Sequence, residues 1–295
     1  MIVEFGKYGN IKDLFLSIDP NHSQVLTLIS GDPGHGKTSL ACACALENMS
    51  YKQLNNVKHA CKKIDYLNTF KRANFRYPSE KHLVYVTGFK VEKFSPKMKS
   101  YDFDPWRVGM GDPTYQTIYF PMHSLRVWDE MQTYYPSQQD QPNSKLPLRV
   151  STEFQKDRHY DIYNIGTSQV STDIHYKLRR ISSFIVTKKV TRHKNKNNVV
   201  TQTTWQTLYF VNRFAYDAYI SSNGDESYAT KKITFVFKGN IGRYYNHTSC
   251  EQEFDDIDNK YCEYDQLYEE PNCLVPPPGY STKETKGENK KNAKD

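Results

Sequence analysis

The stretch from Gly31 to Thr38 carries the clearest chemistry in the sequence. It reads G-D-P-G-H-G-K-T and fits the pattern G-x-x-x-x-G-K-T of a phosphate-binding P-loop. Glycines in such a loop let successive backbone N–H groups point at phosphate oxygens. Lys37 can reach the β- and γ-phosphates of a nucleotide, and the Thr38 hydroxyl can ligate Mg²⁺. The predicted ATP-contacting residues are Gly31, Asp32, Pro33, Gly34, His35, Gly36, Lys37, Thr38 and Ser39.

The residues on either side of this stretch are those that a P-loop requires. Residues 25–30 form a short apolar run that suits a buried parallel strand. Residues 39–49 are rich in helix formers, so a helix N-terminus can add its partial positive charge to the loop. The alternative is a glycine-rich turn that matches the pattern by chance. The strand before it and the helix after it favour the functional interpretation.

An acidic pair, Asp129-Glu130, follows the short predicted strand 124–128. This is the Walker B pattern, in which Asp129 helps to hold Mg²⁺ and Glu130 deprotonates the attacking water. Arg126 interrupts the usual apolar run, and Trp128 is bulky. The alternative is an ordinary acidic strand end, which the preceding P-loop disfavours.

The predicted strand that begins at Asp161 ends in polar residues, and Gln169 lies just beyond it. Ligands bind beyond the carboxyl ends of strands in a parallel sheet. Gln169 is therefore placed to sense the γ-phosphate or the attacking water. A neighbour of a helix N-terminal cap is an equal alternative on this evidence.

Composition limits the class of protein. The chain has 295 residues, with 23 Tyr and 15 Phe, so a hydrophobic core can form. Its net charge of +7 is compatible with an anionic partner. None of the six cysteines forms a C-x-x-C pair, which disfavours a zinc site or disulfide framework and favours reduced thiols. No apolar run approaches 18 residues, and the N-terminus lacks a signal-peptide pattern. We therefore expect neither a transmembrane helix nor a leader.

The order of patterns predicts an α/β fold followed by a β-hairpin extension. The predicted divisions are an N-terminal strand and helix at 1–23, a P-loop ATPase core at 24–186, a β extension of the same domain at 187–250, and an acidic segment with a disordered tail at 251–295. Within the core we expect a polar insertion at 50–80, a strand at 83–87, a long aromatic loop at 88–122 and a helix at 145–159. In the extension, strand-like runs cover 184–192, 200–212 and 232–238.

Several stretches, taken in order, resemble the N-terminal ATPase domain of the zonula occludens toxin (Zot) family, which includes the gene I assembly proteins of filamentous phages. The similar stretches are Gly31 to Thr38, Tyr119-Phe120-Pro121, Trp128 to Ser137, Phe154 to Tyr160 with its Arg158-His159 pair, Ile165 to Gln169, and Phe237 to Ile241 with Tyr244-Tyr245. The spacing D-E-x-Q, R-H-Y and S-Q is much more specific than the P-loop alone.

The resemblance implies a P-loop NTPase of the additional-strand class, with the strand that ends at Gln169 between the P-loop strand and the Walker B strand. It also implies a ring, of which a hexamer is the expected form. Arg158, Arg179 and Arg180 are then candidates for a finger that reaches a neighbouring γ-phosphate. For each of them, pairing with a local carboxylate is the alternative. Many family members carry a transmembrane helix after this domain, which this sequence lacks, so we do not predict toxin activity.

A cluster of basic residues marks the predicted hairpin. Lys188, Lys189, Arg192 and Lys194 can touch a single-stranded DNA backbone without reading sequence. Trp205 and Tyr209 on the returning strand can offer stacking surfaces. We expect this hairpin to lie outside the nucleotide site. A solvated surface turn is the alternative.

Three functions are considered as hypotheses. The first is an ATP- and Mg²⁺-dependent motor that extrudes a filamentous phage, acting on single-stranded DNA and coat protein in the host cytoplasm, peripheral to the inner membrane through a partner. The second is a DNA-packaging or helicase-type ATPase without a membrane role. A third, a nucleotide-binding scaffold that does not hydrolyse, is disfavoured by Glu130.

Overall fold

The computed structural model describes most of the predicted core and the β extension. The described residues are 1–8, 11–22, 24, 26–48, 84–91, 100–102, 124–137, 148–157 and 162–246. The predicted insertion at 50–80, the tail at 251–295 and Arg158 lie outside them.

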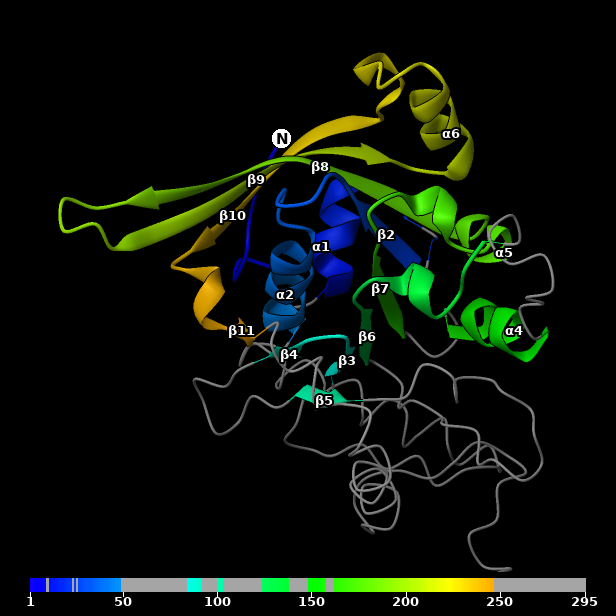
Figure 1. Ribbon diagram of the computed structural model, residues 1–295, viewed down its shortest axis with the longest axis horizontal. Coiled ribbons are helices and arrows are strands. Elements are labelled where there is room, and N and C mark those ends of the chain that lie inside the picture. Colours follow the sequence, from blue (N-terminus) through cyan, green and yellow to red (C-terminus); the bar gives the residue numbers. More distant parts are fainter. Residues whose placement is uncertain are drawn as a thin grey trace, which may run out of the picture.

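One mixed sheet organises the described chain (Figure 1). Its strands, in spatial order, are β1 (Ile2–Glu4), β10 (Lys231–Lys238), β9 (Val200–Phe210), β8 (Ser182–Lys194), β2 (Leu26–Ser30), β7 (Tyr163–Thr167), β6 (Leu125–Trp128), β3 (Val84–Thr87) and β5 (Ser100–Asp102). The strands from β8 to β5 are parallel to one another, and β9 is antiparallel to both of its neighbours. The predicted α/β P-loop fold is therefore confirmed.

The strand β7 lies between β2 and β6, as the resemblance implies. Leu28 of β2 pairs with Gly166, and Val127 of β6 pairs with Ile165 on the other side of β7. The strand that carries the P-loop and the strand that ends at Asp129-Glu130 are thus separated by a third strand. Their carboxyl ends meet at one edge of the sheet, where ligands bind in folds of this type.

Helices cover both faces of the sheet and bury two apolar clusters. On one face lie α1 (Ile11–Ile18) and α2 (Lys37–Asn48), and on the other α4 (Leu148–Lys156), α5 (Tyr176–Arg179) and α6 (Arg213–Ser221). Among the described helices, none is long and apolar enough to cross a lipid bilayer.

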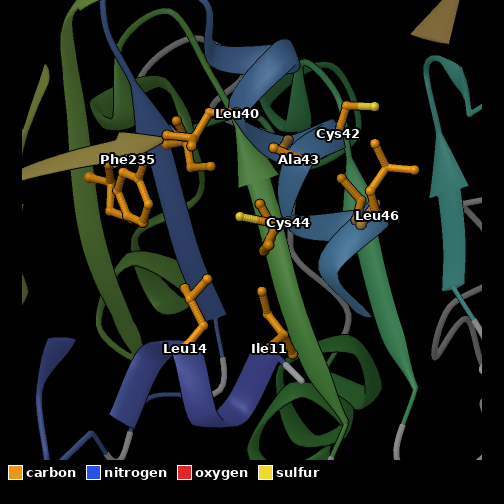
Figure 2. Packing of buried hydrophobic residues seen from close by; sticks show 14 of the residues in the cluster. Ile11, Leu14, Leu40, Cys42, Ala43, Cys44, Leu46 and Phe235 are labelled. Atoms are coloured by element: carbon orange, nitrogen blue, oxygen red, sulfur yellow. The ribbon is translucent and has the colours of Figure 1, made fainter. Parts of the chain in front are cut away.

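The helix α2 is buried on almost all sides, and many of its own side chains are small. Residues 41–45 read A-C-A-C-A, and each of them is at most 1% exposed. Figure 2 shows Cys42, Ala43 and Cys44 on α2 against the sheet, with Ile11 and Leu14 of α1 near the far end of the helix, and all of them belong to one apolar cluster with Phe235 of β10. Burial raises the pKa of both thiols, so they remain neutral, unpaired cysteines inside the core.

Two predicted segments differ from the structure. The expected loop at 88–122 contains two short strands: β4 (Lys90–Val91), which pairs with β11 (Tyr245–Asn246), and β5, which pairs with β3. The expected strand at 200–212 ends at Phe210, and α6, which the pattern did not predict, begins at Arg213. The Asn212 side chain caps α6 by accepting a hydrogen bond from the N–H of Ala215.

Arg126, which interrupts the apolar run of the Walker B strand, has a structural partner. Its guanidinium is fully buried, forms an ion pair with Asp157 and donates to Asn164 Oδ1 at 2.6 Å. Asn164 in turn donates to Asp157 at 2.8 Å. The guanidinium also lies over the rings of Trp128 and Phe154, at 5.3 and 5.1 Å. This network ties the end of α4 to β6 and β7.

Replacing Asp157 with Ala should destabilise the fold by about 3–5 kcal/mol, because it leaves the Arg126 charge buried without its partner. The double variant Arg126→Met/Asp157→Leu removes both charges and should recover most of that loss. Equilibrium urea unfolding of the three proteins measures the difference. A single variant as stable as the wild type would contradict the role of this pair.

Candidate nucleotide site

The P-loop connects the last residue of β2, Ser30, to the first residue of α2, Lys37. Two of its glycines are required by close approach as well as by conformation. Gly31 has φ 144°, and a Cβ there would lie 2.5 Å from the carbonyl oxygen of Thr187 on β8. Gly36 has φ 81°, and a Cβ there would lie 3.0 Å from the indole nitrogen of Trp205 on β9. Any other residue at either position would push the loop away from these strands.

Lys37 folds back across this loop. Its Nζ donates to the carbonyl oxygen of Gly31 at 2.9 Å and lies 3.4 Å from that of Asp32. The Lys37 side chain is buried, which is rare for a lysine that is not paired with a carboxylate. The ammonium group is therefore held over the loop that is predicted to bind phosphate. The glycine-rich backbone and this positive charge together fit a polyphosphate.

Thr38 and Asp129 meet directly. The Thr38 hydroxyl donates to the Asp129 carboxylate, at 2.9 and 3.2 Å from its two oxygens. Asp129 also accepts a hydrogen bond from the hydroxyl of Thr167 at the end of β7. Hydroxyl and carboxylate oxygens are the hard ligands that Mg²⁺ prefers, so this pair fits the predicted metal residues. Among the described residues, no cluster of three or more His, Cys, Asp or Glu side chains competes with it.

Glu130 stands next to this pair in an unusual conformation. Its backbone is left-handed, with φ 48° and ψ 53°, and its N–H donates to the Thr167 hydroxyl at 3.0 Å. Thr167 thus contacts both members of the acidic pair. Non-glycine residues in this region are uncommon and concentrate at functional sites.

Gln169 lies beside the start of the P-loop. Its carbonyl oxygen accepts a hydrogen bond from the N–H of Gly31 at 3.3 Å, and its side chain is exposed. The preceding Ser168 donates its N–H to Ile29 of β2 at 3.0 Å. The structure therefore brings together the predicted loop, Asp129, Glu130 and Gln169 at one edge of the sheet.

The base of the β8–β9 hairpin supports the P-loop from the side, which the sequence analysis missed. Trp205 is fully buried, and its indole N–H lies 3.2 Å from the Gly36 carbonyl oxygen and 3.0 Å from the Ser39 hydroxyl. The Thr187 hydroxyl donates to the carbonyl of Ser30 at 3.0 Å. The prediction that the hairpin lies outside the nucleotide site is therefore wrong for its base.

The predicted stacking role of Trp205 and Tyr209 is also wrong. Both side chains are 0% exposed and belong to the core cluster around α2, so neither can stack on a base. Thr203, Trp205, Thr207 and Tyr209 alternate along β9 and are all buried, which places them on one face. This alternation along the strand was the signal in the sequence from which the burial of Trp205 and Tyr209 could have been predicted.

The segment that ends at β11 lies close to the same site. Burial raises the pKa of Tyr245, an effect that the charge of Arg192 opposes and that Cys42 and Asp129 reinforce. The Cys42 thiol lies 3.8 Å from the Tyr244 carbonyl oxygen, so β11 passes alongside α2. Arg192 is exposed and, by strand alternation, shares the face of β8 that carries Val190, next to Gly36.

The two described finger candidates lie away from their own P-loop. The helix α5 directly precedes β8, and β8 is parallel to β2, so α5 lies at the opposite end of the sheet from the loop. Arg179 is 13% exposed and faces Asp217 at 3.7 Å, which is the local pairing considered as its alternative. Burial lowers its pKa, and Asp217 opposes that shift. Arg180 is exposed.

Residues 188–202 form an exposed hairpin arm that reaches beyond the helices (Figure 1). Lys189, Arg192 and Lys194 are exposed on it. Lys188 is engaged locally, because its Nζ lies 3.8 Å from Glu226 and 3.4 Å from the Tyr219 hydroxyl. Among the described residues, no ion pair of this kind engages the other three predicted basic residues of the arm.

No protein-family model matches the chain, and no curated protein does. Among solved structures it is similar to the N-terminal domain of zonular occludens toxin from Neisseria meningitidis, with 14% identity, 76% of this chain and 99% of that chain covered, and a TM-score of 0.36. It is also similar to the genome packaging NTPase B204 from Sulfolobus turreted icosahedral virus 2 in complex with AMPPCP (13%, 74% and 93%, 0.32). The flagellar accessory protein FlaH from Methanocaldococcus jannaschii is a third (10%, 65% and 80%, 0.33).

The first of these structures is a domain of the family that the sequence resembles.

Replacing Trp205 with Phe should weaken ATP binding about tenfold, since it removes the indole N–H that holds Gly36 and Ser39. Tyr209→Phe is the matched control: it removes a hydroxyl from the same face of β9, where that hydroxyl contacts Asp19 and not the P-loop. Isothermal titration with ATP and Mg²⁺ measures both. Equal affinities for the two variants would show that Trp205 only fills the core.

Proposed function

We propose that the chain is an ATP-hydrolysing P-loop enzyme that works as a nucleic-acid motor. The observation that carries the proposal is the direct contact between Thr38 and Asp129, at 2.9 Å, with Lys37 and Glu130 beside it. These four residues come from two segments that are far apart in the sequence. A chance glycine-rich turn would not bring a Walker B acid to the threonine that follows its lysine.

Each residue has a role that its position supports. Lys37 and the loop N–H groups neutralise the β- and γ-phosphates. Thr38 and Asp129 would hold Mg²⁺, which supplies charge compensation for the phosphates when bound. Glu130 accepts the proton of the attacking water, and Gln169 is placed to orient that water or to sense the γ-phosphate. This assigns hydrolysis, and not mere binding, to the site.

We further propose a ring, with an arginine from one subunit completing the site of the next. Arg179 and Arg180 lie at the end of the sheet opposite to the P-loop of their own subunit. This position favours a role at the nucleotide site of a neighbouring subunit. Arg158 stays a candidate on sequence grounds. Arg180 is the better described candidate, because it is exposed while Arg179 faces Asp217.

The substrate of the motor is proposed to be single-stranded DNA in a phage assembly process. The sequence contains no Asp or Glu between Asp173 and Asp217, so the hairpin arm carries charge of one sign. Such an arm attracts a phosphate backbone. Extrusion of a filamentous phage with its coat protein is the specific form that the sequence resemblance favours. Packaging of DNA in the cytoplasm is the alternative.

Lys37→Ala should abolish turnover by removing the loop's positive charge, whereas Glu130→Gln should bind ATP and hydrolyse it at least about 100-fold more slowly. Asp129→Asn should weaken the response to Mg²⁺. Phosphate release and ATP binding, measured on each variant, test the roles separately. Asp225→Asn, at an exposed acid, is the control. Wild-type turnover in both Lys37→Ala and Glu130→Gln would falsify the assignment.

Replacing Lys189, Arg192 and Lys194 together with Gln should reduce the affinity for single-stranded DNA and flatten its salt dependence. Each lost phosphate contact changes the slope of log K against log [salt] by about 0.7, so three contacts change it by about 2. Replacing Lys7, Lys12 and Lys177 removes the same charge elsewhere and serves as the control. If both triple variants lose the same slope, the arm is only part of a general positive field.

A further inference from the structure

Gln132 makes one specific contact in the site that the proposed mechanism does not use. Its side-chain amide donates a hydrogen bond to the Glu130 carboxylate. Glu130 directly follows Asp129, and Gln132 lies in the 3-10 helix η2 (Met131–Thr133). A hydrogen bond to an ionised group is stronger than one between neutral groups. The spacing D-E-x-Q therefore produces a defined interaction in the folded chain.

The backbone of Glu130 is fixed independently of this contact. Its N–H donates to Thr167 at 3.0 Å, and its carbonyl oxygen accepts from the N–H of Thr133 at 2.9 Å. The Met131 side chain that follows is fully buried in the cluster around α4. The position of the residue is thus set by β7 and by η2. The direction of its flexible side chain is set by Gln132.

The contact differs from the usual behaviour of a glutamine in a surface turn. Gln132 is partly buried, and its amide oxygen is buried without a hydrogen-bond donor among the described residues. Burying an amide oxygen without a hydrogen-bond donor costs free energy. The Gln132 side chain would avoid this cost if it turned outward into solvent. The observed orientation keeps the amide nitrogen on Glu130 instead.

We propose that Gln132 is a positioning residue for hydrolysis, which fixes the direction in which Glu130 presents its carboxylate. This inference rests on the proposed function, in which Glu130 accepts the proton of the attacking water. A general base works only within hydrogen-bond reach of that proton, and a misplacement of about 1 Å can lower a rate about 100-fold. Gln132 acts on the base and not on the phosphate-binding loop. Its effect therefore falls on kcat and not on ATP binding.

The test is a double-mutant cycle of Gln132→Met and Glu130→Gln, assayed for ATPase kcat and KM. Methionine keeps the length of the side chain and removes the amide donor. Gln132→Met should lower kcat at least about tenfold with an unchanged KM for ATP. In the Glu130→Gln background it should have no further effect, because the group it positions is already gone. Gln132→Ser, which suits a turn, should reproduce the result if methionine is poorly tolerated.

Thr133→Val is the matched control, since Thr133 is exposed in the same turn and should keep the wild-type kcat. Two results overturn the inference: a kcat for Gln132→Met within about twofold of wild type, or the same fractional loss in the Glu130→Gln background, which marks a structural effect. Failure of the proposed function looks different. In that case Glu130→Gln alone keeps its turnover, and the positioning role falls with it.

Discussion

The nucleotide site depends on how the P-loop is held against β8 and β9. A loop of this kind has few hydrogen bonds of its own, and its buried polar groups must be satisfied by other segments. Thr187 bonds the carbonyl at the end of β2, and Trp205 bonds the carbonyl of Gly36. Gly31 and Gly36 are the residues that approach these strands most closely. The same glycines that free the loop N–H groups for phosphate also let the loop lie on its support.

The additional strand has a chemical consequence beyond topology. Because β7 lies between β2 and β6, its last residue, Thr167, ends between the P-loop and the acidic pair. One hydroxyl then contacts the Asp129 carboxylate and the Glu130 backbone. If β2 and β6 were adjacent, no strand end would fill this position. The spacing of the two acids relative to Thr38 is therefore a property of three strands and not of the Walker motifs alone.

The features that the sequence predicted are those encoded by neighbouring residues. The P-loop, the strand end at Asp129-Glu130 and the strand before Gln169 each follow from a local pattern. The features that it missed join distant segments: Trp205 contacts a loop 169 residues away, and Arg126 is explained by Asp157 and Asn164. Because Trp205 lies among Thr and Gln residues in the sequence, it was predicted to be exposed and to offer a stacking surface. Alternation along β9 shows why it is buried, since every second residue faces α2.

The hairpin arm and the P-loop support are parts of the same two strands. The ladder between β8 and β9 runs from Phe184↔Phe210 to Lys194↔Val200, with irregularities at Thr187/Lys189 and at His193/Lys194. The first irregularity lies where β8 contacts the P-loop, and bulges bend and twist a strand locally. Beyond it, Val190 faces Gly36, and Arg192, two residues further along the same strand face, is already exposed. The arm and the residues that hold the P-loop are therefore joined through the same β8–β9 ladder, whose first irregularity lies beside Thr187 and its hydrogen bond to Ser30.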